Sequence, residues 1–251
     1  MNGQNAMPRF LTALPVYNEV SHVDAVLDLV KQYSPNILAV DDGSTDGTSQ
    51  LLAQRSDVQV LLHQENRGYG AALASAFGYA IEHDYEWLIT IDCDGQHQPH
   101  MIGDFVQRAA TTGADIVSGS RYLKKFVVDS EPPEQRLWVN RQITSDLNRM
   151  FGFELTDAFC GFKAYKVTSL KKLNITEFGY GMPLQLWVQA ACHHFRIVEL
   201  PVPLVYTGEQ RTFGEHLDDT ATRLNYYHGV IERALEALPC GCEKGFLKSS
   251  L

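Results

Sequence analysis

The stretch WLITIDCDGQHQP, residues 87–99, decides how the rest of the chain is interpreted. Its first five residues are apolar apart from one threonine, which predicts a buried strand that ends at Asp92. Side chains two apart in extended backbone point the same way, so Asp92, Asp94 and Gln96 can direct oxygen atoms at one cation. Mg²⁺ and Mn²⁺ prefer such ligands. We therefore predict a metal site at these three residues; for an isolated Asp-x-Asp, a solvated turn is the alternative.

Outward from this stretch, the first half of the chain alternates short apolar runs with helical patterns. The apolar runs predict strands at residues 10–14, 37–40, 58–62, 87–91 and 116–118. Helical patterns lie between them at residues 20–33, 48–55, 68–82 and 99–112. This alternation with short connections predicts an α/β fold, with a mostly parallel sheet that helices cover on both faces.

The second half of the chain is less regular. Its patterns predict helices at residues 134–150, 183–192 and 217–238, and strands at residues 162–165 and 197–200. Pro201 and Pro203 cannot donate ladder hydrogen bonds, so the segment after the last strand should be a sheet edge or no strand. Because we see no repeat or convincing linker, we expect residues 1–251 to form one domain.

Polar clusters follow three of the predicted strands, at the sheet edge where α/β proteins bind ligands. Pro15, Tyr17 and Glu19 follow the first strand. Tyr17 can line a nucleotide base, and Glu19 can cap the next helix or bond the nucleotide. Asp42 follows the second strand in VDDGSTDGT, where its carboxylate can accept hydrogen bonds from a ribose or a base N–H. The third cluster is the predicted metal site.

A glycine-rich helix start forms a fourth cluster, NRGYGAA, residues 66–72. Asn66 and Gly70 lie where a helix N-terminus favours a phosphate-like negative charge, so we include both among the candidate ligand-binding residues. Close packing of the helix is an equally good interpretation of the glycines.

The bulk composition excludes other classes of function. The chain carries a net charge of −9 and has a pI near 5.4, which argues against nucleic-acid binding and weakly against electrostatic adhesion to anionic membranes. No run approaches the ~18–20 apolar residues of a membrane-spanning helix, and the first residues lack a secretory pattern. We therefore expect a cytoplasmic protein, and the odd number of cysteines favours a reducing compartment.

Taken in order, seven segments resemble family 2 glycosyltransferases, and most closely the dolichyl-phosphate mannosyltransferase and polyprenyl-phosphate glycosyltransferase branch. They are LPVYNE, VDDGSTDGT, NRGYGAA, DCDGQHQP, GSRY, TDAFCGFKAY and VELPVPLVY, and the resemblance spans residues 10–227. It implies a GT-A fold, an inverting mechanism, Mg²⁺ or Mn²⁺ as cofactor, and GDP-mannose or a UDP-hexose as donor. The donor-binding half is then about residues 10–120, and the acceptor half and terminal helix about 121–238.

The resemblance also implies roles for residues of the second half. Arg121 in GSRY matches an arginine that meets donor phosphates, and Arg141 and Arg211 look like a second and a third. Three arginines suit a diphosphate donor beside a phosphate acceptor, here a polyprenyl or dolichyl phosphate. Asp157 matches the family's catalytic carboxylate. It would act as general base for a hydroxyl acceptor, and would only orient a phosphate acceptor or the metal.

Other interpretations stay open. After Gly214 the chain has Glu215 and His216 where the family often has Ser and Lys, so the acceptor can instead be a hydroxyl group of a glycan or small molecule. The chain can also be a non-catalytic nucleotide-sugar-binding module. A sugar-1-phosphate nucleotidyltransferase would carry a glycine-rich loop where LPVYNE stands. With a lipid acceptor we expect a peripheral protein on the cytoplasmic membrane face, with recruitment by a partner as one route.

Overall fold

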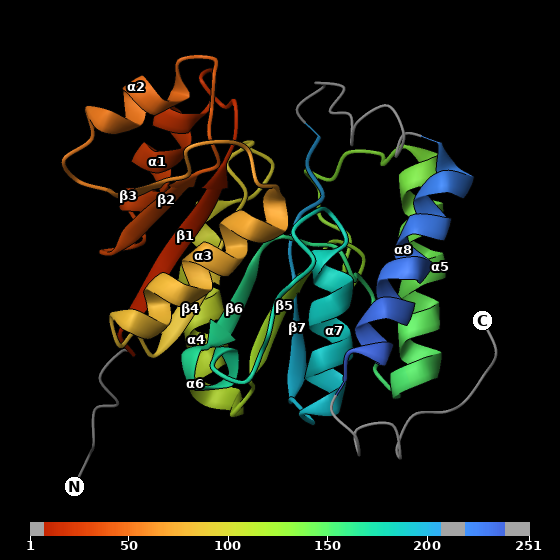
Figure 1. The fold of residues 1–251 in the computed structure, drawn as a ribbon. Coiled ribbons are helices and arrows are strands. Elements are labelled where there is room, and N and C mark those ends of the chain that lie inside the picture. Colours follow the sequence, from red (N-terminus) through yellow and green to blue (C-terminus); the bar gives the residue numbers. More distant parts are fainter. Residues whose placement is uncertain (1–7, 207–218, 239–251) are drawn as a thin grey trace, which may run out of the picture.

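Seven strands form one sheet in the order β3-β2-β1-β4-β6-β5-β7 in the computed structural model, which describes residues 8–206 and 219–238 (Figure 1). The strands are β1 (Phe10–Val16), β2 (Ile37–Asp41), β3 (Gln59–Leu62), β4 (Trp87–Thr90), β5 (Ile116–Ser120), β6 (Lys163–Lys166) and β7 (Ile197–Pro201). Strand β6 runs antiparallel to both of its neighbours, and the other pairings between these strands are parallel. The prediction of a mostly parallel sheet is therefore confirmed.

Helices cover both faces of this sheet, as predicted. They are α1 (Val23–Lys31), α2 (Thr48–Ala53), α3 (Tyr69–Glu82), the 3-10 helix η1 (Pro99–Met101), α4 (Ile102–Thr112), α5 (Glu134–Phe151), α6 (Val167–Leu170), α7 (Met182–Cys192) and α8 (Thr220–Glu236). Alternate side chains along a strand enter different cores. In β2, Leu38 and Val40 join the core beneath α3 and α7, whereas Ile37 and Ala39 join the core beneath α1 and α4. A strand buried on both faces must be apolar throughout, which explains the continuous runs in the sequence.

The strand order creates a crevice at one sheet edge. Strand β1 pairs with β2 on one side and with β4 on the other, so the chain moves outward through β2 and β3 and then returns to the other side of β1. Such a reversal leaves an opening beyond the carboxyl ends of the strands, where α/β proteins bind ligands. The three polar clusters of the sequence follow β1, β2 and β4.

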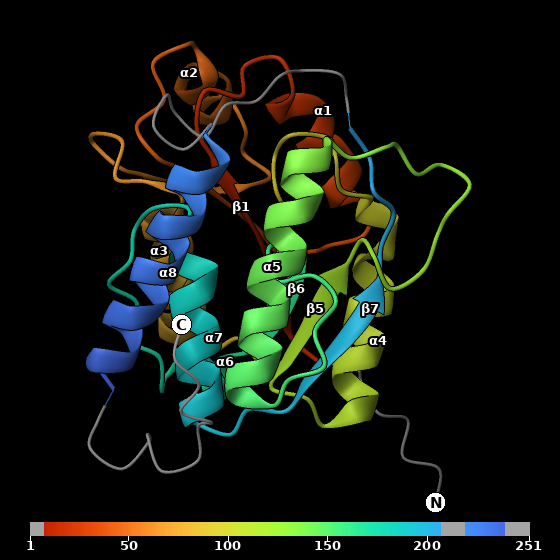
Figure 2. The same ribbon diagram turned by 90° about the vertical axis from the view of Figure 1, so that its right-hand side faces the viewer.

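The helices of the second half stand opposite this crevice. Helix α8 packs against both α5 and α7, and both ribbon views show these three helices beside one another (Figures 1 and 2). Figure 1 shows them on the opposite side of the molecule from α1 and α2. Their shared core includes Val139 and Ile143 of α5 together with Tyr227 of α8. The second half of the chain thus contributes one wall of the site.

Several element boundaries differ from the expected ones. Helix α1 starts at Val23 rather than at residue 20, because a turn with Asn18 in the left-handed region precedes it. The short helix α6 was not predicted. Strand β7 ends at Pro201 on the sheet edge, as the prolines indicate. Cys192 is disulfide-bonded, which is unusual for the reducing compartment that the odd number of cysteines favoured, whereas Cys93 and Cys160 are free.

Candidate functional site

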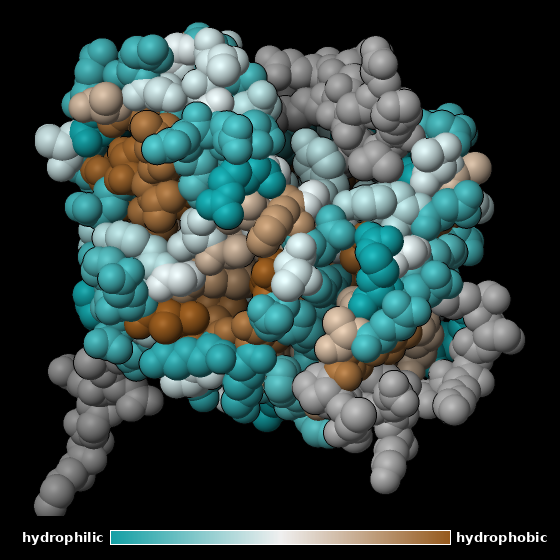
Figure 3. Space-filling view, in the orientation of Figure 1, coloured by the Kyte–Doolittle hydropathy of each residue, from teal (hydrophilic) through white to brown (hydrophobic). Residues whose placement is uncertain are grey.

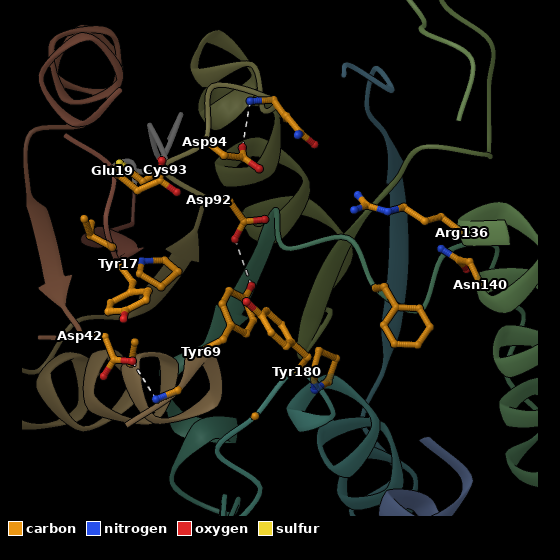
Figure 4. A pocket seen from close by; sticks show the side chains of 18 of the residues that line it. Tyr17, Glu19, Asp42, Tyr69, Asp92, Cys93, Asp94, Arg136, Asn140 and Tyr180 are labelled. Carbon is orange, nitrogen blue, oxygen red and sulfur yellow. Dashed lines mark hydrogen bonds between the residues drawn. The ribbon is translucent and has the colours of Figure 1, made fainter. Parts of the chain in front are cut away.

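A cavity of about 420 Å³ lies at the carboxyl ends of β1, β2 and β4 (Figure 4). Most of the residues predicted from the sequence line it: Pro15, Tyr17, Glu19, Asp42, Asn66, Asp92, Asp94, Gln96 and Arg121. Figure 4 shows the carboxylates of Asp92 and Asp94 facing the cavity, with Arg136 and Asn140 of α5 across from them. The cavity therefore has an acidic wall and a basic wall.

The acidic wall is built on the turn that follows β4. Tyr69 donates a hydrogen bond from its hydroxyl to Oδ1 of Asp92 at 3.1 Å, and the backbone N–H of Gln96 donates to Oδ1 of Asp94 at 2.9 Å. Gly161 lies directly against the Asp92 carboxylate, and a Cβ there would overlap both carboxylate oxygens. The fold thus reserves space for Asp92 at the cavity wall.

His97 supports the same turn, although it was not among the residues predicted for the site. Its Nδ1 accepts the backbone N–H of Asp92 at 3.1 Å, which leaves Nε2 to carry the proton, 3.8 Å from Oδ2 of Asp92. The histidine thereby orients the residue that carries the first carboxylate. His97 lies within the segment DCDGQHQP, next to the predicted metal ligands. Its place in that segment could have identified it as a residue of the site.

Asp42 shapes the loop before α3. Its carboxylate accepts backbone hydrogen bonds from Arg67 at 3.0 Å and from Gly68 at 2.7 Å, and it contacts Nδ1 of His63 at 2.6 Å. Gly68 has a φ of +101°, which favours glycine there. Asp42 lines the cavity while organising its rim.

Gly70 does not line the cavity. A Cβ at this position would meet the backbone oxygen of Glu177 and the side chain of Met182, so the glycine is required for close packing of α3. The aromatic residue between the two glycines was missed. Tyr69 lines the cavity and stacks on Tyr180, with ring centroids 6.1 Å apart.

Asp157 is fully buried and forms a bidentate ion pair with Arg121. Nε of Arg121 donates to Oδ2 at 2.7 Å and Nη2 donates to Oδ1 at 2.9 Å. Oδ1 also accepts from Nδ2 of Asn140 at 2.7 Å and from the backbone N–H of Phe159 at 3.1 Å. Burial raises the pKa of Asp157, but the Arg121 guanidinium and these hydrogen bonds lower it to about 2. The carboxylate is thus a permanent anion that holds Arg121 at the cavity wall.

The other arginines of the basic wall differ from those that the resemblance implied. Arg141 is exposed on α5 and is not among the residues that line the cavity. Arg136, on the same helix, and Arg223, on α8, do line it. Arg223 is 5% exposed, an unusual degree of burial for an arginine. Arg211 lies outside the described residues, as do Gly214, Glu215 and His216.

Comparisons with known proteins identify the family of the chain. The family model described as "Glycosyl transferase family 2" matches residues 12–173. The chain belongs to that family. A relative from Micrococcus luteus, an undecaprenyl-phosphate mannosyltransferase, is 30% identical over 218 residues, which are 82% of this chain and 86% of the relative. A polyprenol monophosphomannose synthase from Mycolicibacterium smegmatis is 30% identical over 204 residues, 77% of this chain and 76% of that protein.

Solved structures confirm the fold. Glucosyl-3-phosphoglycerate synthase from Mycobacterium tuberculosis, crystallised with Mn²⁺, UDP and phosphoglyceric acid, gives a TM-score of 0.70 at 16% identity. The match covers 93% of this chain and 81% of that chain. This family 2 glycosyltransferase therefore has the predicted GT-A fold. Within the part of the chain that the structure describes, no helix is both long and apolar enough to span a bilayer.

Proposed function

We propose that this glycosyltransferase moves a hexose from a GDP- or UDP-linked sugar to a polyprenyl phosphate, with inversion at the anomeric carbon. The observation that carries the proposal is the pair of oppositely charged walls across one cavity. Asp92 and Asp94 lie on one side, and Arg121, Arg136 and Arg223 contribute to the lining from the second half of the chain. The two relatives described above are named for transfer to polyprenyl phosphates, which supports the acceptor class.

The acidic wall fits a divalent cation. Asp92 and Asp94 both line the cavity, and among the described residues no group of three or more His, Cys, Asp or Glu side chains could hold a metal ion on its own. Asp92 and Asp94, with Gln96 beside them, would hold Mg²⁺ or Mn²⁺, ions that commonly complete their coordination with water and substrate phosphates. When bound, the ion would supply positive charge for the departing diphosphate.

The first half of the chain is proposed to bind the donor. Tyr17 is 45% exposed at the cavity rim, where its ring can stack on a base. Asp42 keeps its carboxylate at the rim through the two backbone hydrogen bonds of Arg67 and Gly68. This division makes residues 10–120 the donor half and residues 121–238 the acceptor half of one domain.

The state of Asp157 favours a phosphate acceptor over a hydroxyl acceptor. A general base needs a free lone pair directed at the substrate and a pKa near the working pH. Asp157 instead has 0% exposure, a pKa of about 2 and a carboxylate that Arg121, Asn140 and Phe159 already bond. A phosphate acceptor is already anionic and needs neutralisation by arginine more than it needs a base. A polyprenyl phosphate acceptor would bring the reaction to a membrane surface, which we propose is the cytoplasmic face.

The decisive assay offers radiolabelled GDP-mannose and UDP-hexoses to the purified protein, with a polyprenyl phosphate and the corresponding polyprenol as competing acceptors. We expect label only on the phosphate, and loss of transfer in EDTA. Asp94→Asn should lower turnover at least ~100-fold. Glu82→Gln is the matched control. Glu82 is the last residue of α3, whose first residue, Tyr69, lines the cavity, so this variant removes a carboxylate at the end of the helix that is far from the site. Label on the polyprenol alone would support the hydroxyl-acceptor alternative, and binding of a nucleotide sugar without any transfer would indicate a binding module.

A further inference from the structure

The loop that joins β5 to α5, residues 121–133, presents apolar side chains to solvent. Val127 is 105% exposed and Val128 is 63% exposed. Leu123, earlier in the same loop, is 46% exposed. In Figure 2 this loop extends away from the body of the molecule beside the start of α5. Single exposed apolar residues are common, but three large aliphatic side chains gathered on one projecting loop form a candidate contact surface.

The tip is an ordered turn. The backbone N–H of Asp129 donates to the carbonyl of Phe126 at 3.3 Å, and Oδ2 of Asp129 accepts the N–H of Phe126 at 2.7 Å. These bonds close a four-residue turn with Val127 and Val128 at its two central positions. Turns usually place Gly, Asn, Asp or Pro there, and β-branched residues are disfavoured. The chain therefore has two valines where turn chemistry alone would select polar residues.

The base of the loop is fastened to the segment after β7. Oδ1 of Asp129 accepts the N–H of Leu204 at 2.8 Å, and the N–H of Ser130 donates to the carbonyl of Leu204 at 2.7 Å. The hydroxyl of Ser130 accepts the N–H of Tyr206 at 3.1 Å. Tyr206 itself lines the cavity. The valine turn is thus held in a fixed position relative to the site.

The part of the loop that leads to the turn is basic, unlike the chain as a whole. The chain has a net charge of −9, whereas residues 121–133 contain Arg121, Lys124 and Lys125 before the turn and Asp129 and Glu131 at its end and after it, a net charge of +1. Lys124 and Lys125 are exposed, whereas Arg121 faces the cavity. Apolar side chains at a tip, with two exposed lysines on the side of the loop that leads to it, suit a bilayer whose surface carries anionic headgroups.

We propose that the valine turn, Phe126–Asp129, inserts the side chains of Val127 and Val128 into the headgroup region of an anionic membrane and so holds the cavity against the surface that contains the acceptor. This inference rests on the proposed function for the source of the acceptor, but not for membrane binding itself. A bilayer fits better than a folded protein partner, because three aliphatic side chains on a narrow loop offer far less than the ~800 Å² per partner of a stable interface. The net charge of −9 opposes attraction of the whole protein to an anionic membrane, so binding would depend on the side chains of this loop.

Vesicle flotation tests the inference directly. The full chain is mixed with vesicles of phosphatidylcholine containing 30% phosphatidylglycerol, or of phosphatidylcholine alone, and the fraction that floats is measured. We expect the wild type to float with the anionic vesicles, and Val127→Asp/Val128→Asp to weaken binding by on the order of tenfold or more. Lys124→Gln/Lys125→Gln should lose about fivefold per lysine with the anionic vesicles only.

The matched control is Leu62→Asp, which introduces the same charge at a side chain that is 61% exposed. Leu62 lies on β3, at the edge of the sheet, where the surface view shows an apolar patch (Figure 3). This variant should float like the wild type. Equal flotation of the valine variant and the wild type would overturn the proposal. Failure of the wild type to float with either vesicle would also overturn it and would point to a protein partner.

A second readout separates this inference from the proposed function. The valine variant should transfer sugar normally to a short-chain isoprenyl phosphate in solution, and should lose activity of the same order as its binding loss when the acceptor is embedded in vesicles. Loss of activity with both acceptors would contradict a docking role. If the wild type transfers sugar to neither acceptor yet floats as expected, the proposed function fails and membrane docking stands.

Discussion

Replacement of Asp157 by Asn should destabilise the fold by leaving the guanidinium of Arg121 without its counter-charge. The lowered pKa of about 2, against a usual 3.8, corresponds to ~2–3 kcal/mol of stabilisation of the charged form. Removal of one partner of a buried ion pair costs about 3–5 kcal/mol in other proteins. We therefore expect Asp157→Asn to lower the free energy of unfolding by ~3 kcal/mol, which in a chain of this length lowers the Tm by roughly 6–12 °C.

A double-mutant cycle with Arg121→Gln tests whether the two residues act as one unit. Urea unfolding at pH 7 would be measured for the wild type, both single variants and the double variant. The double variant should lose no more free energy of unfolding than about the larger of the two single-variant losses, because it leaves neither charge without its partner. Costs that add within ~0.5 kcal/mol would refute the pairing. Activity gives the same test: transfer by Arg121→Gln and by the double variant should be equal if Asp157 acts only through Arg121.

The pH dependence has a definite sign. The pKa of Asp157 is lower in the folded state than in the unfolded state, so its stabilisation is complete above pH ~4 and is lost as the pH falls toward about 2. The stability difference between the wild type and Asp157→Asn should therefore be constant from pH 7 to about 4 and should narrow below that. A difference that changes between pH 5 and 8 would contradict this account. The rate profile should likewise show no acidic limb due to Asp157.

Two further substitutions test the walls of the cavity. Gly161→Ala should displace the Asp92 carboxylate, destabilise the fold by ~1–3 kcal/mol and weaken metal-dependent donor binding in calorimetry. Gly78→Ala is the control: no described atom lies within 4 Å of the new Cβ, so the variant should be neutral or stabilising. Equal effects of the two variants would refute the packing argument. Arg136→Gln should lower kcat/KM for the phosphate acceptor about 10- to 100-fold, whereas Arg141→Gln should change it less than about twofold, and the reverse order would restore the assignment by resemblance.

The sheet and the position of the site could be predicted because both depend on local patterns. Buried strands are continuous apolar runs, and polar residues after three of them must meet at one edge if the strands are parallel. The direction of β6 could not be predicted in this way. A four-residue run has the same alternation in either direction, and only its pairing between β4 and β5 makes Lys163–Lys166 antiparallel.

The positions of individual carboxylates could be predicted from the sequence more reliably than their roles. Asp42, Asp92 and Asp157 all stand in or beside the cavity, as their places after strands or in motifs indicate. Their partners come from distant segments: Asp157 meets Arg121 across 36 residues and Asp42 meets Gly68 across 26. A carboxylate's pKa and free lone pairs depend on such partners, so no local pattern distinguishes a base from an anchor.

The arginines of α5 show that helical rotation carries information that motif spacing does not. Each residue turns a helix by ~100°, so Arg141 points ~140° away from Arg136. Val139, Asn140 and Ile143 all lie within ~60° of Arg136 by the same count, and all three are buried. Arg136 thus belongs to the stripe that faces the interior, at the end of the helix where the core gives way to the cavity. Because the buried stripe is readable from the sequence, periodicity predicts that Arg136 rather than Arg141 reaches the cavity, whereas the resemblance to the family indicated the residue on the solvent face.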